Sequence, residues 1–353
     1  MPRFKVEELQ VIAREVFHAA GFPEGEAEII ANVMSKANLV GHDSHGVIHI
    51  PIYVNRIKKG EISPGAPVEV IRETSNTAIL DGHFTLGYVA ATRAMHLAIE
   101  KARQGAVSSV GVCNLNHIGR VGTYPEMAVE AGMVSIVTCN ASGAWRNVVP
   151  FGGRQPRFAT NPIAIAAPTR RGWPILLDMA TSTVAAAKIR VFQNQKKPVG
   201  DGWIVDKGGN PTHNPDDLFA GGALLPLGGN QGHKGYGLAF MIEILSGILS
   251  RSGTAAMDRS QLSNGTFMIA IDIDAFLPIE KFLDEIEALI DYMKATPPAP
   301  GFSEVLVPGE FEARTGEERR KNGIMVDAET WRQILAVLEE YKIAAKVPHG
   351  RET

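Results

Sequence analysis

The chain has 353 residues, of which 45% are hydrophobic, 21% charged and 7% aromatic, and its formal net charge is -3. This composition is typical of a globular protein of about two domains that can bury a substantial core. The slightly acidic balance disfavours nucleic acid and membrane surfaces as partners.

Hydrophobic periodicity predicts the helices and strands in chain order. Helical spacing of apolar residues predicts helices over 6–17, 27–37, 52–57, 89–103, 123–131, 234–249, 279–294 and 331–341. Runs of strand-forming residues predict a hairpin over 68–73 and 77–81, and further strands over 106–113, 133–139, 162–168, 174–179 and 267–273. Helices therefore open and close the chain, and strands alternate with helices between them.

Two features bear on cellular location. Cys113 and Cys139 lie inside apolar strand-like runs, which predicts two buried thiols in a reducing compartment and no disulfide. The polar, amphipathic stretch over 1–11 is unlike a signal peptide, and no apolar run approaches the ~20 residues of a membrane span. We therefore expect a cytoplasmic protein.

Residues 41–50 contain His42, His45 and His49, although the whole chain has only 10 histidines. Asp43 and Ser44 stand beside them. The pKa of imidazole lies near neutrality, and a neighbouring carboxylate favours the protonated ring. This density of groups is therefore typical of a proton-handling site.

Two other interpretations of the three imidazoles stay open. Because they are spaced three and four residues apart, they would share one face of a continuous helix, where they could bind zinc or have a structural role. Gly41, Gly46 and Pro51 weaken such a helix. We favour proton transfer by His45.

Three further segments place polar residues at the ends of predicted elements. His117 lies just after the strand over 106–113, where a catalytic role and a satisfied loop histidine are both compatible with the sequence. Asp178 lies at the end of the strand over 174–179 and precedes three hydroxyls, so it either caps a helix or holds an imidazole. The glycine-rich stretch over 226–237, with Lys234, predicts a backbone N–H nest for an anion, and a flexible helix entry is the alternative.

The standard phosphate-binding motifs are absent. Gly235 and Gly237 form a Gly-x-Gly pair, but Phe240 occupies the position of the third glycine of a dinucleotide fingerprint. Lys234 follows His233 and not glycine, so there is no Walker A motif either. A bound nucleotide would need a different architecture.

Taken together, these motifs resemble the type 2 malate/L-lactate dehydrogenase family, which also contains ureidoglycolate, sulfolactate, 2,3-diketogulonate and piperideine-2-carboxylate oxidoreductases. The resemblance covers nearly the whole chain. It rests on Gly41 to Val47 with Pro51, Tyr53, Arg56 and Gly60; Asn116, His117 and Gly119; Thr160, Asn161 and Pro162; Leu177, Asp178 and Met179; Pro226 to Tyr236; and Pro308, Gly309 and Glu310.

The resemblance implies an α/β (α+β-like) fold, with a non-Rossmann nicotinamide-binding domain on a mostly antiparallel sheet over 67–277. A helical, substrate-side domain would be assembled from both chain ends, 1–66 and 278–353. NAD or NADP would be the cofactor and a small molecule the substrate. The active site would lie between the domains of a homodimer, near the subunit interface.

The same resemblance implies roles for individual residues. His45 would be the general acid that protonates the substrate carbonyl as hydride arrives, His117 would lie beside the substrate, and Asp178 would orient the acid. Cofactor contacts are implied for His45, Asp178, Met179, Ala180, Thr181, Ser182, Gly228, Gly229, Lys234, Pro308, Gly309 and Glu310. Substrate contacts are expected at Ser44, His49, His117 and Arg146, and no metal ligand is expected.

One position departs from the family pattern. Many members carry Arg three residues after the glycine that follows the catalytic histidine, and this chain has His49 there. An Arg would hold a 2-oxo carboxylate bidentately, which a histidine cannot do, and this argues against plain malate or lactate as the substrate. Arg146 is a candidate replacement contact, and Ala159, where glycine is expected, is a minor change.

We therefore predict an NAD(P)-dependent dehydrogenase or reductase of a small 2-oxo or 2-hydroxy acid, or of a related cyclic imino acid. A metal-dependent hydrolase using His42, His45 and His49 is one alternative. A non-catalytic relative that still binds the cofactor is another. The sequence leaves the exact substrate, the choice between NAD and NADP and the reaction direction open.

Overall fold

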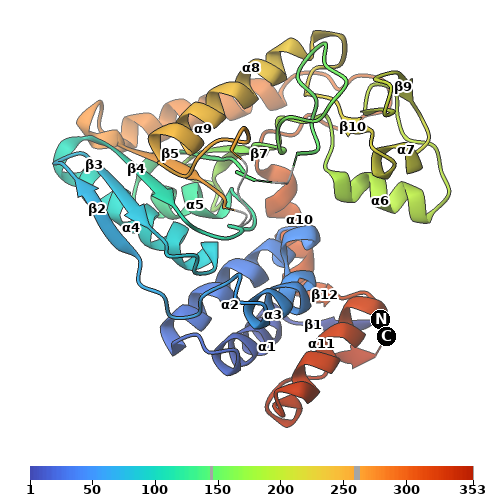
Figure 1. Ribbon diagram of the computed structural model, residues 1–353. Helices are drawn as coiled ribbons and strands as arrows, with labels where there is room; N and C mark the ends of the chain where they lie inside the picture. The colour runs from blue at the N-terminus through green and yellow to red at the C-terminus, as the bar shows by residue number, and fades with distance from the viewer. Residues whose placement is uncertain (144–145, 258–262, 353) are drawn as a thin grey trace.

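The two ends of the chain fold together into one helical region, which is blue and red in Figure 1. The structure is a computed structural model that describes residues 1–143, 146–257 and 263–352. The helical region contains α1 (Val6–Ala19), α2 (Glu24–Leu39), α3 (Ile50–Lys58), α10 (Glu310–Asn322) and α11 (Ala328–Glu340).

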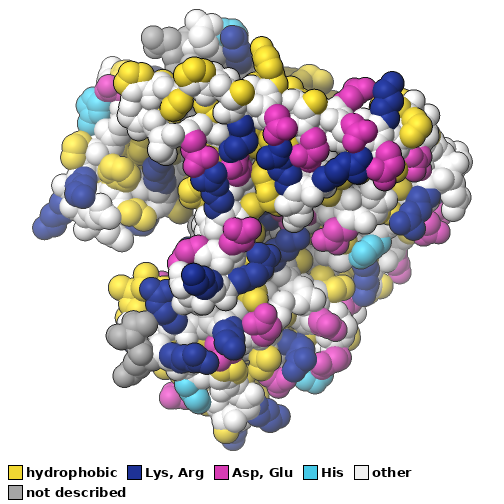
Figure 2. Space-filling view, turned by 180° about the vertical axis from the view of Figure 1, so that it is seen from behind, with side chains coloured by type: hydrophobic (Ala, Val, Ile, Leu, Met, Phe, Trp, Pro, Cys, Tyr) yellow, Lys and Arg dark blue, Asp and Glu magenta, His cyan; other side chains and the backbone are white. Residues whose placement is uncertain are grey.

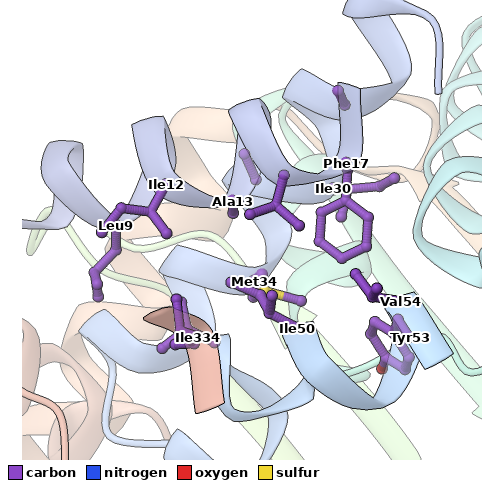
Figure 3. Packing of buried hydrophobic residues seen from close by; sticks show 14 of the residues in the cluster. Leu9, Ile12, Ala13, Phe17, Ile30, Met34, Ile50, Tyr53, Val54 and Ile334 are labelled. Carbon is purple, nitrogen blue, oxygen red and sulfur yellow. The ribbon is translucent and has the colours of Figure 1, made fainter. Parts of the chain in front are cut away.

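The apolar faces of four of these helices share one core. Figure 3 shows the residues that meet there: Ile12 and Phe17 from α1, Ile30 and Met34 from α2, Ile50 and Val54 from α3, and Ile334 from α11. Each of these side chains is at most 2% exposed. Burial of one such side chain contributes about 1.5–3 kcal/mol, so this core fixes α3, and the histidine stretch just before it, against α2.

A small sheet brings the chain ends together. Strand β1 (Pro2–Phe4) lies between β12 (Ile324–Met325) and β13 (Arg351–Glu352), and pairs antiparallel with both. The N- and C-termini consequently lie side by side (Figure 1). The helical region is thus built from both ends of the chain, as predicted.

A seven-stranded sheet forms the second region, in the order β2-β3-β4-β11-β5-β6-β7. Its strands are β2 (Glu69–Glu73), β3 (Thr77–Asp81), β4 (Val107–Cys113), β5 (Met133–Cys139), β6 (Ile163–Ala167), β7 (Ile175–Met179) and β11 (Thr266–Asp272). Five of the six neighbouring pairs are antiparallel, and only β3 and β4 run parallel. The predicted mostly antiparallel sheet is confirmed.

Helices cover both faces of this sheet. Helices α4 (Gly87–Gly105) and α5 (Thr123–Glu130) pack on one face and also contact α2, which joins the sheet to the helical region. Helix α8 (His233–Ile242) continues into a π-helix, η4 (Glu243–Leu249), which packs on β4, β5 and β11. Because α4 and α5 face α2, the loops at the ends of β4 and β7 lie near the junction of the two regions.

A third, smaller region projects from the sheet (Figure 1). It contains α6 (Ala186–Asn194), β8 (Ile204–Val205), β9 (Pro211–Thr212), α7 (Asp216–Phe219) and β10 (Ala223–Leu224). Ile189, Leu218 and Leu224 belong to a separate apolar cluster that stabilises it. The opposite view shows the surface hollowed between this part of the molecule and the helical region (Figure 2).

Most predicted elements are confirmed, and the differences are informative. Helix α6, helix α10 and the short strands of the two small sheets were not predicted, because they lack an apolar stripe or are too short for one. Both cysteines are buried, as predicted. In the described parts of the chain, no helix has the length and apolar character needed to cross a bilayer.

The predicted domain boundaries, 1–66, 67–277 and 278–353, stay a prediction. Helix α9 (Ile279–Lys294), which follows the last boundary, lies beside the sheet in Figure 1. Its acidic side chains pair with the turn between β6 and β7: Arg170 contacts Asp284 at 2.8 Å, and Arg171 contacts Glu287 at 2.7 Å. This helix therefore pairs with the sheet along its length, and its last residue, Lys294, pairs with Glu310 of α10.

Candidate active site

The histidine stretch is not one continuous helix. After α2 ends, two short 3-10 turns, Asp43–His45 and Val47–His49, precede α3. Asn38 fixes both turns, because its amide nitrogen donates to the Asp43 carboxylate at 2.7 Å and its amide oxygen accepts from the backbone N–H of Val47 at 2.8 Å. On a continuous helix His42, His45 and His49 would share one face. The two 3-10 turns break that helix and so separate His42 from the other two.

His42 is directed toward α10 and not toward the other two histidines of the stretch. Its Nε2 lies 3.3 Å from the Glu312 carboxylate. The neighbouring Asp43 forms a two-pronged ion pair with Arg319, at 2.7 and 2.8 Å. These contacts tie the histidine stretch to the C-terminal part of the chain.

His117 takes the place in the imidazole cluster that sequence spacing had given to His42. The rings of His45 and His117 are stacked, with centroids 5.7 Å apart and planes at 22°. The ring of His49 lies 5.2 Å from that of His117 and 6.3 Å from that of His45. The structure therefore brings together three of the predicted catalytic and substrate-binding residues from two distant segments.

Two buried tyrosines form hydrogen bonds with the cluster of His45, His49 and His117. The Tyr53 hydroxyl shares a hydrogen bond of 2.5 Å with Nδ1 of His117, and the Tyr88 hydroxyl donates to the His45 carbonyl at 3.3 Å. The two hydroxyls are themselves 3.3 Å apart. On the other side, the Ser44 hydroxyl shares a hydrogen bond of 3.0 Å with Nδ1 of His45. Both catalytic candidates are thus held in place by polar contacts.

Burial makes the imidazoles hard to protonate. It lowers the pKa of His45 from 6.5 to about 4, and the nearby His49, His42 and Arg120 add to the shift. Burial also lowers the pKa of His117 well below its usual value and lowers that of His49. At neutral pH all three rings are therefore neutral and can accept a proton.

Asp178 lies at the end of β7 and is bound to Arg120. Its carboxylate accepts a hydrogen bond from the backbone N–H of Gly122 at 2.9 Å and lies 3.6 Å from Nε of Arg120. Burial raises the pKa of Asp178, and the Arg120 charge opposes that shift. In the described residues, no imidazole hydrogen-bonds to Asp178.

A chain of charges continues from Arg120 into the helical region. The Arg120 guanidinium donates to Glu126 at 3.0 Å, and Glu126 pairs with Lys36 of α2 at 2.6 Å. Burial alone would raise the pKa of Glu126, but Arg120 and Lys36 together lower it. The Arg120 side chain is 0% exposed, and its Nε and Nη1 have no hydrogen-bond partner among the described residues. This buried cation holds two carboxylates at the junction of the two regions.

Two of the segments with implied cofactor residues lie side by side. The backbone N–H of Leu227 donates to the Thr181 carbonyl at 2.9 Å, and Ser182 forms a β-bridge with Pro226. Directly after this pairing, Gly228 and Gly229 both adopt positive φ, +117° and +54°, which glycine tolerates without strain. The hydroxyls of Thr181 and Ser182 bond to nearby carbonyls and hold the segment in shape.

The turn before α8 is tightly built around a glycine. A Cβ on Gly235 would lie 2.4 Å from the Leu227 carbonyl oxygen, so only glycine fits there. Lys234 is exposed and has no ion-pair partner within residues 1–143, 146–257 and 263–352. A helix N-terminus, a glycine turn and a free cation are the donor set that binds phosphate.

The segment Pro308–Gly309–Glu310 makes internal contacts. Leu176 of β7 donates its N–H to the Pro308 carbonyl at 3.2 Å, and a Cβ on Gly309 would lie 2.5 Å from the Pro174 carbonyl oxygen. Glu310 is paired with Lys294 and Arg314. The segment supports the start of β7, and a direct contact with a cofactor stays a prediction.

Arg146 is not brought into the imidazole cluster by any described contact. Its guanidinium donates to the Met257 carbonyl at 3.5 Å. The residues before it, 144–145, lie outside the described part. Within the described part, no group of three or more His, Cys, Asp or Glu residues is arranged to hold a metal ion.

Tyr53, Tyr88, Arg120 and Glu126 were given no role from the sequence. One signal was available for Tyr53, because it follows His49 by four residues, and their rings are stacked at 5.0 Å. Arg120 follows His117 by three residues in the same loop. Their contacts with residues about 60 positions away depend on the fold, which the spacing alone does not reveal.

Known proteins resemble this chain along nearly its whole length. The sequence profile described as malate/L-lactate dehydrogenase matches residues 4–335. A malate dehydrogenase of Pyrococcus horikoshii is 39% identical over 328 residues, 91% of this chain and 89% of that protein. Hydroxycarboxylate dehydrogenase B of Escherichia coli is 38% identical over 339 residues, 94% of this chain and 92% of that protein. The structure of sulfolactate dehydrogenase from Methanocaldococcus jannaschii has a TM-score of 0.89 at 35% identity, and covers 98% of this chain and 99% of that one.

Proposed function

The chain belongs to the malate/L-lactate dehydrogenase family, and we propose that it exchanges a hydride between NAD or NADP and a small 2-oxo or 2-hydroxy acid, or a related cyclic imino acid. It is an oxidoreductase that acts on CH–OH groups. The observation that carries the finer proposal is the cluster of His45, His49 and His117. This cluster lies at the junction of the helical region and the sheet, beside the Asp178–Arg120 pair.

The residues present fit a dinucleotide. Gly228, Gly229 and the N-terminus of α8 offer backbone N–H groups, and Lys234 offers a positive charge, so they would hold the diphosphate. The residues from Asp178 to Ser182, and the segment from Pro308 to Glu310, would hold the nicotinamide half. When bound, the nicotinamide supplies the hydride donor or acceptor.

His45 would handle the proton that accompanies the hydride. In the oxidation direction the neutral ring of His45 takes the proton from the substrate hydroxyl, and in the reduction direction the protonated ring returns it to the carbonyl oxygen. A bound anionic substrate favours the protonated ring, because an opposite charge nearby raises the pKa of an imidazole. Ser44 holds Nδ1 of His45, so Nε2 is the nitrogen available to the substrate.

The other polar residues position the reacting groups. His117, fixed by Tyr53, would contact the substrate oxygen beside His45. Arg120 opposes the rise that burial causes in the pKa of Asp178, and the carboxylate of Asp178 would act on the nicotinamide or the substrate. This role of Asp178 replaces the direct orientation of an imidazole, for which the described residues show no hydrogen bond.

The proposed assembly is a homodimer. Large apolar side chains stand exposed along α8 and the following π-helix: Phe240 at 49%, Met241 at 51%, Ile248 at 59% and Leu249 at 52%. Exposed apolar surface of this kind is typical of a subunit interface. Light scattering coupled to gel filtration tests the proposal, since a monomer at micromolar concentration would contradict it.

The test of the proposed function is turnover with a panel of substrates. Purified protein is mixed with NADH or NADPH and with 2-oxo acids or cyclic imines and, for the reverse direction, with NAD⁺ or NADP⁺ and with 2-hydroxy acids or ureidoglycolate. The expected result with at least one compound is loss of reduced-nicotinamide absorbance in the reduction direction, or its appearance in the oxidation direction. Cofactor binding without turnover of any compound would identify a non-catalytic relative, and zinc-dependent hydrolysis would overturn the proposal.

A further inference from the structure

The ring of His49 has a defined tautomer. Its Nε2 lies 2.8 Å from the Ser44 carbonyl oxygen, and because a carbonyl oxygen only accepts, Nε2 must carry the proton and donate it. Burial holds the ring neutral, since it lowers the pKa of His49. Nδ1 is therefore unprotonated and can only accept a hydrogen bond.

This accepting nitrogen has no hydrogen-bond partner in the part of the chain that the structure describes. Nδ1 of His49 is buried and makes no hydrogen bond with any described residue. Buried polar atoms in folded proteins are almost always paired, so an unpaired one indicates a missing ligand or water. The nitrogen lies in a ring that belongs to the candidate active site, with the His117 ring 5.2 Å away and the His45 ring 6.3 Å away.

The ring cannot turn to offer a donor instead. It is stacked on Tyr53, with centroids 5.0 Å apart and planes at 11°, and a half-turn would give up the Nε2 bond to Ser44. The nearby cation, Arg56, is engaged elsewhere, since it donates to Glu61 at 2.9 Å and to Asn116 at 2.8 Å. At His49 the described residues therefore present an acceptor, and the neighbouring Arg56 is already paired.

We propose that Nδ1 of His49 accepts a hydrogen bond from a hydroxyl or N–H group of the substrate, and so selects substrates with such a donor next to the reacting carbon. This inference rests on the proposed function and narrows its substrate class. A carboxylate has only acceptors and would leave Nδ1 unpaired, so it is disfavoured at this position. Hydroxylated 2-oxo acids, 2-oxo amides and ureido or imino compounds carry the required donor.

Matched substrate pairs test the proposal. Hydroxypyruvate adds one hydroxyl to pyruvate, and pyruvamide replaces its carboxylate by an amide with N–H donors. We expect kcat/KM of the wild type to favour at least one of these over pyruvate by about 10-fold or more, the effect of one buried hydrogen bond. A wild type that prefers pyruvate to both would overturn the proposal.

Two variants locate the effect at His49. His49→Phe keeps a flat ring on Tyr53 but removes both nitrogens, so the preference should fall to about 1-fold, the ratio expected without the bond. His49→Arg supplies donors and should reverse the preference toward pyruvate. The same replacement at an exposed site, His96→Phe in α4, is the control and should keep the wild-type ratio. An unchanged ratio in His49→Phe would refute the role of Nδ1.

A second measurement does not depend on turnover. In ¹⁵N NMR spectra of the full chain with labelled histidine, Nδ1 of His49, assigned by its loss in His49→Phe, should be unprotonated and should shift on addition of hydroxypyruvate but not of pyruvate. A protonated Nδ1 overturns the proposal even if the enzyme is active. Absence of all turnover with the predicted NMR response would instead contradict the proposed function and leave the His49 inference supported.

Discussion

The Tyr53 hydroxyl lies 2.5 Å from Nδ1 of His117, although the two residues are 64 positions apart in the chain. Tyr53 is buried and His117 is half-buried, and Tyr53 also packs in the core that holds α3 against α2. Figure 3 shows Tyr53 at the edge of that core. The packing of the helical region therefore sets the orientation of a ring in the candidate active site.

Replacement of Tyr53 by Phe removes this contact and keeps the ring. We expect kcat/KM to fall by roughly 5- to 30-fold, because a hydrogen bond to a buried ring contributes about 1–2 kcal/mol. The unfolding free energy should fall by a similar amount. Steady-state kinetics and urea unfolding are the measurements, and a Tyr53→Phe enzyme with wild-type kinetics would show that Tyr53 does not position His117.

His45→Ala should separate chemistry from cofactor binding. General acid–base catalysis contributes about 10²- to 10⁴-fold, so kcat should fall by that factor while the Kd for NADH changes little. The two quantities are measured by steady-state turnover and by nicotinamide fluorescence titration. Equal losses in both would contradict a proton-transfer role and would indicate that His45 mainly binds the cofactor.

Much of the fold could be predicted because apolar residues recur at regular spacing. Helices such as α1 and α11 have a strong apolar stripe and were located within a few residues. Helix α10 was missed because it is mostly charged and buries only Glu310 and Gly316. It is held by ion pairs with residues far away in the chain, and no local pattern reports those.

Individual residues of the candidate site could be predicted from the sequence, but the contacts between them could not. The sequence pointed to His45, His117 and Asp178 as candidates, and the structure places the first two in one stack. The contact of His42 with Glu312 could not be foreseen, because the two 3-10 turns interrupt the helical period. The Arg120–Asp178 pair likewise depends on how the loop after β4 meets the end of β7.

Stability should depend on pH through the buried imidazoles. Because the folded pKa of His45 lies at about 4 and its ordinary value is 6.5, the unfolded chain binds a proton that the folded protein does not bind between these values. The contribution of neutral His45 to the unfolding free energy is therefore fully present above about pH 6.5 and is lost as the pH falls. Between about pH 7 and about pH 5, the unfolding free energy should decrease by about 2 kcal/mol through His45 alone.

Urea unfolding at the two pH values measures this effect. His45→Asn cannot take up a proton, so its loss of stability on acidification should be smaller than that of the wild type. The exposed-histidine variant His96→Gln is the control. An unfolding free energy that does not change between the two pH values would contradict the burial of neutral imidazoles.

Arg120→Met should destabilise the protein strongly. The variant leaves Asp178 and Glu126 buried without their shared cation, and removal of one partner from a buried ion pair typically costs about 3–5 kcal/mol. Arg120→Lys keeps the charge and should lose less. Chemical denaturation followed by circular dichroism is the measurement, and similar losses in both variants would show that shape, and not charge, is what Arg120 provides.

Two glycines of α8 offer a matched test of the cofactor segment. A Cβ at Gly235 would lie 2.4 Å from the Leu227 carbonyl oxygen, whereas a Cβ at Gly237 would meet nothing within 4 Å. Because overpacking costs about 1–3 kcal/mol, Gly235→Ala should weaken NAD(P) binding by roughly 5- to 150-fold. Gly237→Ala should leave binding unchanged and stabilise the helix by up to about 1 kcal/mol. Calorimetric titration measures the dissociation constant of NAD(P) for both variants. Equal dissociation constants would show that the cofactor binds elsewhere.

The most direct test follows the hydride itself. NADH or NADPH carrying deuterium at both C4 positions of the nicotinamide is incubated with the enzyme and the 2-oxo acid that it reduces best, and the product is analysed by mass spectrometry and proton NMR. One deuterium on the carbon that bears the new hydroxyl is the result we expect. A product with no deuterium at that carbon would contradict hydride transfer in this site.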